Sequence, residues 1–135
     1  MYTRIDVNTR FRIDFSWWEQ RGRNLRRFLE EMLGDSDAAE TVGEEPIDYI
    51  DPVTAEVLQL DPLWVKVLLE RAAKPDFITS STPLTNAMLR ALIENVNNPM
   101  TVVDLQHRLG RGTPDSLLRV MRAARSEYGI VPVAE

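Results

Sequence analysis

Residues 83–133 read PLTNAMLRALIENVNNPMTVVDLQHRLGRGTPDSLLRVMRAARSEYGIVPV, and this stretch decides the predicted fold. Its apolar residues recur at helical spacing in three separate segments. It closes on residues 130–133, which are rich in β-formers and hold a proline suited to an edge strand. The stretch therefore predicts a long helix, a short helix, a tight turn, a further helix and a strand, in that order.

Hydroxyl, proline and glycine residues mark the predicted helix boundaries. Thr82-Pro83 and Thr113-Pro114 each place a hydroxyl N-cap before a proline, whose missing N–H costs nothing at the first helical position. Thr101, with an aspartate three residues later, predicts a capping arrangement for the short helix. Gly110 and Gly129 stand where helices commonly end in a left-handed residue.

The third helix separates an apolar side from an arginine side on a helical wheel. The apolar residues that cluster together are Leu117, Val120, Met121, Ala124 and Tyr128. Arg119, Arg122 and Ser126 fall on the opposite side, with Arg125 on its flank. The planar guanidinium of arginine suits phosphate and the O6/N7 edge of guanine. A helix with this layout is typical of DNA recognition helices.

These residues resemble the winged helix-turn-helix superfamily over about the last third of the chain. The motifs that carry the resemblance are Thr101-x-x-Asp104-Leu105, Leu109-Gly110, Thr113-Pro114, and Leu117 with Met121 one turn later. A complete wing needs two strands, and only two residues follow Val133, so the second wing strand is either missing or supplied from elsewhere in the chain. Three-helix units of this shape also serve as protein-docking modules.

The resemblance implies a small DNA-binding or transcription-associated protein with its recognition helix at about residues 114–127. The residues expected to meet DNA are Arg119, Arg122 and Ser126 toward the major groove, with Arg125 on their flank, and Thr101, Arg111 and Thr113 toward backbone phosphate. A homodimer is compatible with this interpretation, because such domains commonly read half-sites with two-fold symmetry.

The N-terminal segment predicts a strand followed by a helix. Residues 2–15 alternate loosely between apolar and charged side chains, which indicates an extended segment that pairs with another strand, residues 130–133 being a candidate. Ser16 with Glu19 predicts a capping box and a helix that runs to about Leu33. Trp17 and Trp18 point about 100° apart on such a helix. We therefore expect one in the core and the other as an exposed anchor for a protein partner.

The middle of the chain is acidic. No Lys or Arg occurs between Phe28 and Val65, whereas eleven Asp and Glu do. Residues 35–46 are predicted to form a flexible acidic loop, which either docks on a basic partner or only keeps the chain solvated. Residues 47–50 and 56–60 flank a loop that begins with Asp-Pro, and they predict a β-hairpin. Asp61-Pro62 begins a short helix that is expected to reach about Ala73.

Composition excludes several classes of protein. The 135 residues, 44% hydrophobic and 27% charged, are those of a soluble globular protein. There is neither an apolar run of about 18 residues nor a secretory signal, so we expect no membrane partner. The absence of cysteine excludes disulfides and fits a cytoplasmic protein. Residues 1–82 carry a net charge of −6 and residues 83–135 a net charge of +1, whereas dedicated duplex binders usually show a stronger basic footprint.

The sequence shows no pattern that predicts an enzyme, a metal site or a cofactor. His107 is the single histidine, so we expect a structural or exposed role for it. No glycine-rich phosphate loop occurs. Asp48 and Asp51 are near one another in sequence, as metal or acid–base chemistry would need, but the edge of a hairpin explains them more simply.

The sequence therefore predicts an α+β, mostly helical fold in four segments: an N-terminal strand and helix (1–34), the acidic loop (35–46), a β-hairpin with a short helix (47–81), and a winged-helix-like unit (82–135). DNA binding through the helix-turn-helix is the leading function. The alternative is a non-enzymatic protein-interaction or adaptor module, which docks on a larger assembly through Trp17 and Trp18.

Overall fold

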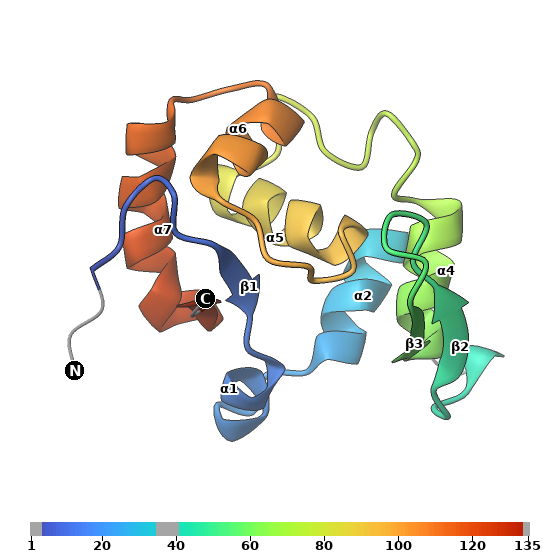
Figure 1. The fold of residues 1–135 in the computed structure, drawn as a ribbon. Coiled ribbons are helices and arrows are strands. Elements are labelled where there is room, and N and C mark those ends of the chain that lie inside the picture. The colour runs from blue at the N-terminus through green and yellow to red at the C-terminus, as the bar shows by residue number, and fades with distance from the viewer. Residues whose placement is uncertain (1–3, 35–40, 134–135) are drawn as a thin grey trace. The chain divides into compact units, whose positions relative to one another are not determined.

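The computed structural model describes residues 4–34 and 41–133, and the chain forms two compact units (Figure 1). Unit 1 comprises Met1–Gly22 and Ile78–Glu135, and unit 2 comprises Arg23–Phe77. The described residues hold six helices and two small antiparallel sheets, so the predicted α+β class is confirmed.

Unit 1 is built around three helices that contact one another: α5 (Leu84–Glu94), α6 (Val102–Leu109) and α7 (Pro114–Tyr128). Each contributes fully buried apolar side chains, among them Met88 and Leu92, Val102 and Leu105, and Leu117 and Met121. Burial of such side chains is the main favourable term in folding. The predicted order of helices in this part of the chain is confirmed.

The ends of α6 and α7 follow the predicted signals. The Thr101 hydroxyl accepts from the Asp104 N–H at 3.1 Å, and the Asp104 carboxylate accepts from the Thr101 N–H at 3.0 Å. Gly110 and Gly129 are left-handed, at φ 66° and 62°. The start of α5 was predicted wrongly, since Pro83 is its N-cap and no side chain caps the helix. The Thr82 hydroxyl instead accepts from the Thr79 N–H within the preceding turn.

The two chain ends of unit 1 form one sheet. Strand β1 (Phe11–Ile13) pairs antiparallel with β4 (Ile130–Pro132), with Arg12 opposite Val131. On its other side, β1 makes an isolated bridge to Met100, where Phe11 and Met100 exchange backbone hydrogen bonds of 2.8 and 2.9 Å. The strand that pairs with the C-terminal segment therefore comes from the N-terminus, as the alternation of residues 2–15 allowed.

Asn97 extends this pairing with its side chain. Its Oδ1 accepts from the Ile13 N–H at 2.8 Å, and its Nδ2 donates to the Ile13 carbonyl at 2.9 Å. The amide thus satisfies the backbone groups that a third strand would otherwise bond. Asn97 has a φ of 58°, a left-handed conformation that asparagine tolerates better than most residues. Strand β1 is consequently bonded on both sides.

The predicted single helix over residues 16–33 was wrong, because the chain forms two helices. Helix α1 (Phe15–Gln20) ends before Gly22, which has a φ of 68°, and α2 (Leu25–Leu33) starts after it. The predicted Ser16 capping box was also wrong. Asp14 is the N-cap of α1 and accepts from the Ser16 N–H at 3.0 Å.

Unit 2 contains α2, α4 (Pro62–Glu70) and a hairpin of β2 (Ile47–Ile50) and β3 (Val57–Leu60). The hairpin and the Asp61 N-cap of α4 are confirmed, although α4 ends three residues before the predicted Ala73. Helices α2 and α4 contact one another, and the Arg26 guanidinium donates to the Asp61 carboxylate at 2.7 Å. Residues 35–40 of the predicted acidic loop lie outside the described residues.

Candidate nucleic-acid interface

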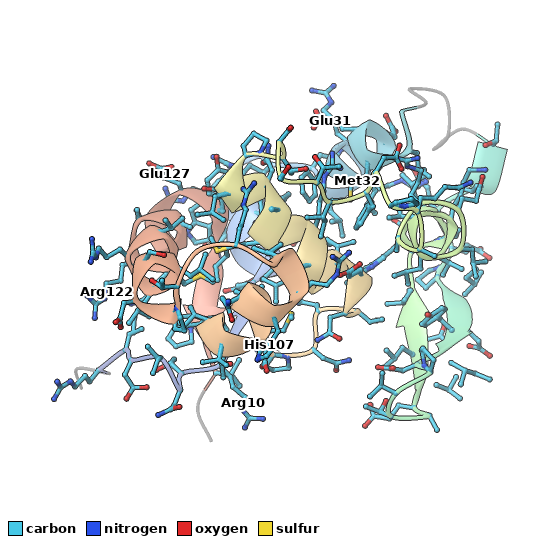
Figure 2. All side chains as sticks on the ribbon, turned by 90° about the horizontal axis from the view of Figure 1, so that it is seen from above. Arg10, Glu31, Met32, His107, Arg122 and Glu127 are labelled. Atoms are coloured by element: carbon cyan, nitrogen blue, oxygen red, sulfur yellow. The ribbon has the colours of Figure 1, made fainter. Side chains whose placement is uncertain are left out.

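Helix α7 presents the predicted arginine side to solvent. Leu117, Met121 and Ala124 are buried, whereas Arg119, Arg122 and Ser126 are exposed, and Arg125 is half-exposed. Figure 2 shows Arg122 projecting from the outer side of this helix. The helical periodicity therefore assigned the apolar and polar sides of α7 correctly, apart from Leu118, which is also buried.

Arg122 holds the N-terminal segment against α7. Its guanidinium donates to the carbonyl of Ile5 at 3.3 Å, and Ile5 itself is buried. A guanidinium has five N–H donors, so one such bond leaves most of them available to a ligand. The contact also limits the rotamers of Arg122, which lowers the entropy that binding would cost.

The side chains of Arg119 and Arg125 are available to bind an anion. Neither side chain forms a hydrogen bond or ion pair with any residue in ranges 4–34 and 41–133. An arginine that no carboxylate neutralises keeps its full attraction for an anion. Together with Arg122, these two side chains make α7 a cationic surface over about two helical turns.

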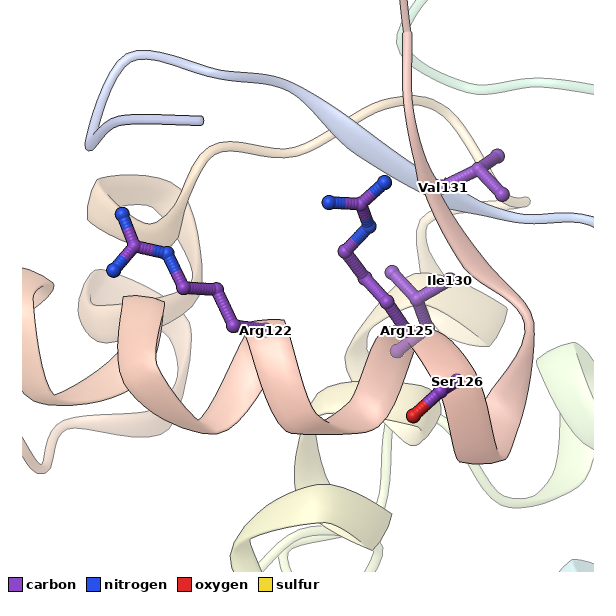
Figure 3. A pocket seen from close by; sticks show the side chains of 5 residues that line it. All are labelled: Arg122, Arg125, Ser126, Ile130 and Val131. Carbon is purple, nitrogen blue, oxygen red and sulfur yellow. The ribbon is translucent and has the colours of Figure 1, made fainter. Parts of the chain in front are cut away.

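An open pocket of about 370 Å³ lies between the last turns of α7 and β4. Its lining consists of Arg122, Arg125, Ser126, Ile130 and Val131. Figure 3 shows Arg122 and Arg125 rising from the same side of α7, with the two β4 residues beyond them. The pocket therefore combines two guanidinium groups, one hydroxyl and an apolar wall, a set that suits a phosphate with a sugar or base beside it.

Arg12 belongs beside this pocket, although it was not among the residues predicted to bind. Phe11 and Ile13 are buried on one face of β1, so Arg12 lies on the other face, next to its cross-strand partner Val131. The Ser16 hydroxyl holds the pKa of Asp14 below its ordinary value, and the charge of Arg12 adds to this effect. The period-two pattern combined with the predicted pairing to residues 130–133 would have placed Arg12 here. We call Arg12, Arg119, Arg122 and Arg125 the arginine face.

The structure gives Arg111 a role that the sequence did not predict. Its two terminal nitrogens donate to the carbonyls of Ser80 and Thr82, each at 2.5 Å. These bonds fasten the turn between α6 and α7 to the segment that precedes α5. Arg111 therefore positions the turn between α6 and α7, and its guanidinium is directed at protein carbonyls.

The hydroxyls of Thr101 and Thr113 serve their own helices. Each accepts a backbone hydrogen bond of 3.1 Å, from Asp104 and Ser116 respectively. The hydroxyl proton of such a cap can still be donated to an outside acceptor. Both residues thus stay compatible with the predicted phosphate contacts, while their structural role as N-caps is established by the geometry.

Trp17 and Trp18 both support the end of α7. Trp18 is only 4% exposed, and its indole N–H donates to the Tyr128 carbonyl at 2.7 Å. Trp17 is half-buried, lies against Gly129 and carries the Arg21 guanidinium 4.9 Å above its ring. One tryptophan is in the core, as expected. Trp17, the remaining candidate anchor, is partly covered by these contacts.

Other polar groups near α7 set limits on the arginine face. Asp115 and Glu127, at the two ends of the helix, are exposed and bring negative charge. His107 is exposed on α6 (Figure 2). Within residues 4–34 and 41–133, no group of three His, Cys, Asp or Glu is placed to hold a metal ion.

Comparison with known proteins yields no relative for this chain. No family model, curated protein or solved structure matches it. Among the described helices, none combines the length and the apolar character needed to cross a bilayer.

Proposed function

We propose that this protein binds duplex DNA, with α7 as the recognition helix of a winged helix-turn-helix. The observation that carries the proposal is the arginine face, in which the side chains of Arg119 and Arg125 have no partner among the described residues. Arg119 and Arg122, on the exposed side of the helix, would enter the major groove. Arg125 and Arg12 would contact the backbone phosphates along one strand.

The frame around α7 supports this proposal because it is fixed before any ligand arrives. Reciprocal capping bonds hold the starts of α6 and α7, and Arg111 fastens the turn between them. Strand β4, which follows α7, is held by its antiparallel pairing with β1. Preorganisation of this kind reduces the ordering cost of binding.

The distribution of charge is also favourable. Unit 1 holds ten Lys and Arg against eight Asp and Glu, whereas unit 2 holds six against thirteen. The acidity of the whole chain therefore resides outside the unit that carries α7. The small excess in unit 1 predicts binding of modest strength that depends strongly on salt, since phosphate neutralisation supplies most of it.

A pair of double variants tests the proposal. Arg119→Ala with Arg122→Ala should weaken binding to a random-sequence duplex, by about 1–3 kcal/mol for each arginine that hydrogen-bonds to a base edge. The matched control is Arg27→Ala with Lys74→Ala, which removes two exposed positive charges from unit 2. Equal affinity of the two double variants at low salt would refute the proposed interface, provided that both unfold at the wild-type temperature.

A variant that removes a negative charge from α7, and should therefore raise the affinity for DNA, provides a second test. Asp115 precedes Arg119 by four residues, so the two lie on the same side of α7. If that side meets phosphate, Asp115→Asn should raise DNA affinity by removing a repulsion. Glu56→Gln in unit 2 is the control, because it removes the same charge from a residue outside α7. A response to Glu56→Gln as large as that to Asp115→Asn would indicate a general charge effect and contradict the assignment.

The second candidate function is a protein-interaction module, and a specific observation favours it. The large apolar side chains that are most exposed among the described residues all lie in unit 2. They do not include Trp17 or Trp18, so a docking surface on this protein would be centred elsewhere.

A further inference from the structure

The exposed apolar side chains of unit 2 gather on the β2–β3 hairpin. Those that are strongly exposed are Ile47, Ile50, Val53, Val57 and Leu69, of which only Leu69 lies outside the hairpin. Ile50 and Val57 are direct cross-strand partners and are 64% and 62% exposed. Val53, in the connecting loop, is 83% exposed. A soluble chain rarely leaves several large aliphatic side chains together in water without a partner for them.

The two faces of the hairpin differ. Tyr49, Leu58 and Leu60 belong to the face that is partly or fully buried, because side chains alternate along each strand. Ile50 and Val57 share the opposite face with Asp48 and Gln59, whose side chains are hydrogen-bonded to each other. The exposed face therefore has an apolar end and a polar end. We call Ile50, Val53 and Val57 the hairpin tip.

The hairpin tip is held in place by its own loop. Asp51 is buried, and its carboxylate accepts from the Val53 N–H at 2.9 Å. The backbones of Asp51 and Glu56 are also joined by a bond of 2.9 Å. The hairpin presents its apolar side chains without needing to order the loop on binding, which favours affinity.

Both strands offer an edge for pairing. Within the described residues, β2 and β3 form a two-stranded sheet, so each has one edge with no neighbouring strand. Proteins usually protect such edges with lysine, proline or a covering element. Strands β2 and β3 contain no lysine or proline. An extended peptide could add to the open edge of β2 or of β3 through backbone hydrogen bonds.

The negative charge around the hairpin tip favours a basic partner. Asp48 and Glu56 are exposed on the hairpin, Glu44 and Glu45 are exposed just before it, and no Lys or Arg occurs between Phe28 and Val65. A second copy paired through a two-fold axis would bring these carboxylates against themselves, which is unfavourable. A segment with basic residues beside aliphatic ones matches both the charge and the apolar surface.

We propose that the β2–β3 hairpin is a docking site for an extended segment of a basic partner protein, in which aliphatic residues alternate with Lys or Arg. The aliphatic residues would cover Ile50, Val53 and Val57, and the cations, which point to the opposite face of the extended segment, would lie near Glu56. This site is in a different unit from the arginine face and does not depend on DNA binding. The two activities would make the protein a link between nucleic acid and a basic protein.

A peptide titration of the full-length, ¹⁵N-labelled chain tests the proposal. The probe is a capped octapeptide of alternating lysine and valine, and its matched control replaces every lysine with glutamate. We expect the basic peptide to shift the amide resonances of residues 47–60, and the acidic peptide to leave them unchanged. Added salt should weaken the interaction, because exposed charges are screened.

Variants separate docking on the tip from general attraction of charge. Ile50→Thr with Val57→Thr keeps the β-branched character of both strands and should weaken peptide binding at least about tenfold. Leu69→Thr is the control, because Leu69 is 72% exposed but lies on α4. The DNA-interface variant Arg119→Ala with Arg122→Ala should bind the peptide as wild type does, so failure of one site is distinguishable from failure of the other.

Three results would overturn the proposal. The first is an absence of binding by the basic peptide, or equal binding by the acidic one. The second is unchanged binding in the Ile50→Thr, Val57→Thr variant, with the wild-type unfolding temperature showing that its fold is intact. The third is a concentration-dependent shift of the hairpin resonances without peptide, together with a doubled hydrodynamic mass, which would make a second copy the occupant.

Discussion

Removal of the Asn97 amide should destabilise unit 1, because this side chain occupies the place of a strand beside β1. Its two hydrogen bonds with Ile13, of 2.8 and 2.9 Å, join residues 84 positions apart in the sequence. A typical intramolecular hydrogen bond contributes about 0.5–1.5 kcal/mol net, so Asn97→Gly should lower the free energy of unfolding by about 1–3 kcal/mol. Asn97→Ala should cost roughly 1 kcal/mol more, because alanine at φ 58° is strained and glycine is not.

Urea denaturation gives the free energies, and hydrogen exchange identifies the bond. A loss of about 2 kcal/mol should lower the unfolding temperature by roughly 6–10 °C in a chain of this size. The Ile13 amide should exchange faster in Asn97→Gly than in the wild type, because its acceptor is gone. Asn86→Ala is the control, since Asn86 is exposed on α5 and its side chain forms no hydrogen bond with the described residues.

Two results would refute this reasoning. If Asn97→Gly unfolds within about 0.5 kcal/mol of the wild type, the range of neutral surface changes, the amide does not support β1. If Asn97→Gly is less stable than Asn97→Ala, the backbone at this position does not strain alanine. In both cases the hydrogen-exchange rate of the Ile13 amide would show whether the pairing of β1 has weakened.

Three further predictions concern unit 1. Gly129→Ala should destabilise the protein by about 2–4 kcal/mol, because φ is positive and the new methyl would lie 2.6 Å from the Trp17 ring; in a Trp17→Ala background urea unfolding should show a cost of only about 1–2 kcal/mol. Arg111→Ala should cost about 1–3 kcal/mol of stability through its bonds to Ser80 and Thr82, and it should leave the salt dependence of DNA binding unchanged, whereas removal of a phosphate-binding cation would reduce the slope by about one. The pKa of Asp14 is lowered from its ordinary value of 3.8, so the charged carboxylate stabilises the protein above that pH, and this stability is lost as the pH falls through the lower pKa of the folded state. Asp14→Asn should therefore be less stable than the wild type near neutral pH, and its free energy of unfolding should fall less on acidification. An equal fall in the free energy of unfolding in the two proteins would contradict this prediction.

The local signals in the sequence predicted most of the elements correctly. Gly110 and Gly129 end helices because they adopt the left-handed conformation, and the Thr101 and Thr113 hydroxyls begin helices because they accept the free N–H groups of the first turn. The hairpin was equally predictable, since its two β-rich runs flank an Asp-Pro loop. These features depend only on residues a few positions apart.

The break between α1 and α2 shows where local patterns mislead. Trp18 and Leu25 are seven residues apart, so the apolar spacing continues across Gly22 as though one helix ran through it. The positive φ at Gly22 and the extended backbone and side-chain cap of Asn24 separate the two helices. Glycine is tolerated within helices at a cost of about 1 kcal/mol, so the presence of Gly22 alone did not show whether the chain forms one helix or two.

Contacts between distant segments were beyond the reach of sequence patterns. Arg111 was expected at phosphate because it lies in the turn before α7, and no sequence pattern predicted that two of its N–H groups bond to carbonyls near residue 80. Arg12 was assigned to a strand without being assigned to the site, although its partner Val131 lines the pocket. The Arg111 bonds depend on backbone placement that no short-range signal specifies, whereas the alternation of residues 2–15, combined with the pairing to residues 130–133, could have placed Arg12.

The measurement that tests the central proposal most directly is the affinity of the purified protein for random-sequence and genomic duplex DNA across a salt series. Two phosphate contacts, those of Arg12 and Arg125, predict a slope of log affinity against log salt near −1.8, which is about a tenfold loss between 50 and 200 mM. Enrichment of particular genomic sequences would add base readout by α7. No binding at about 50 mM salt, where phosphate contacts are strong, would contradict the proposal and leave protein docking as the better account of this chain.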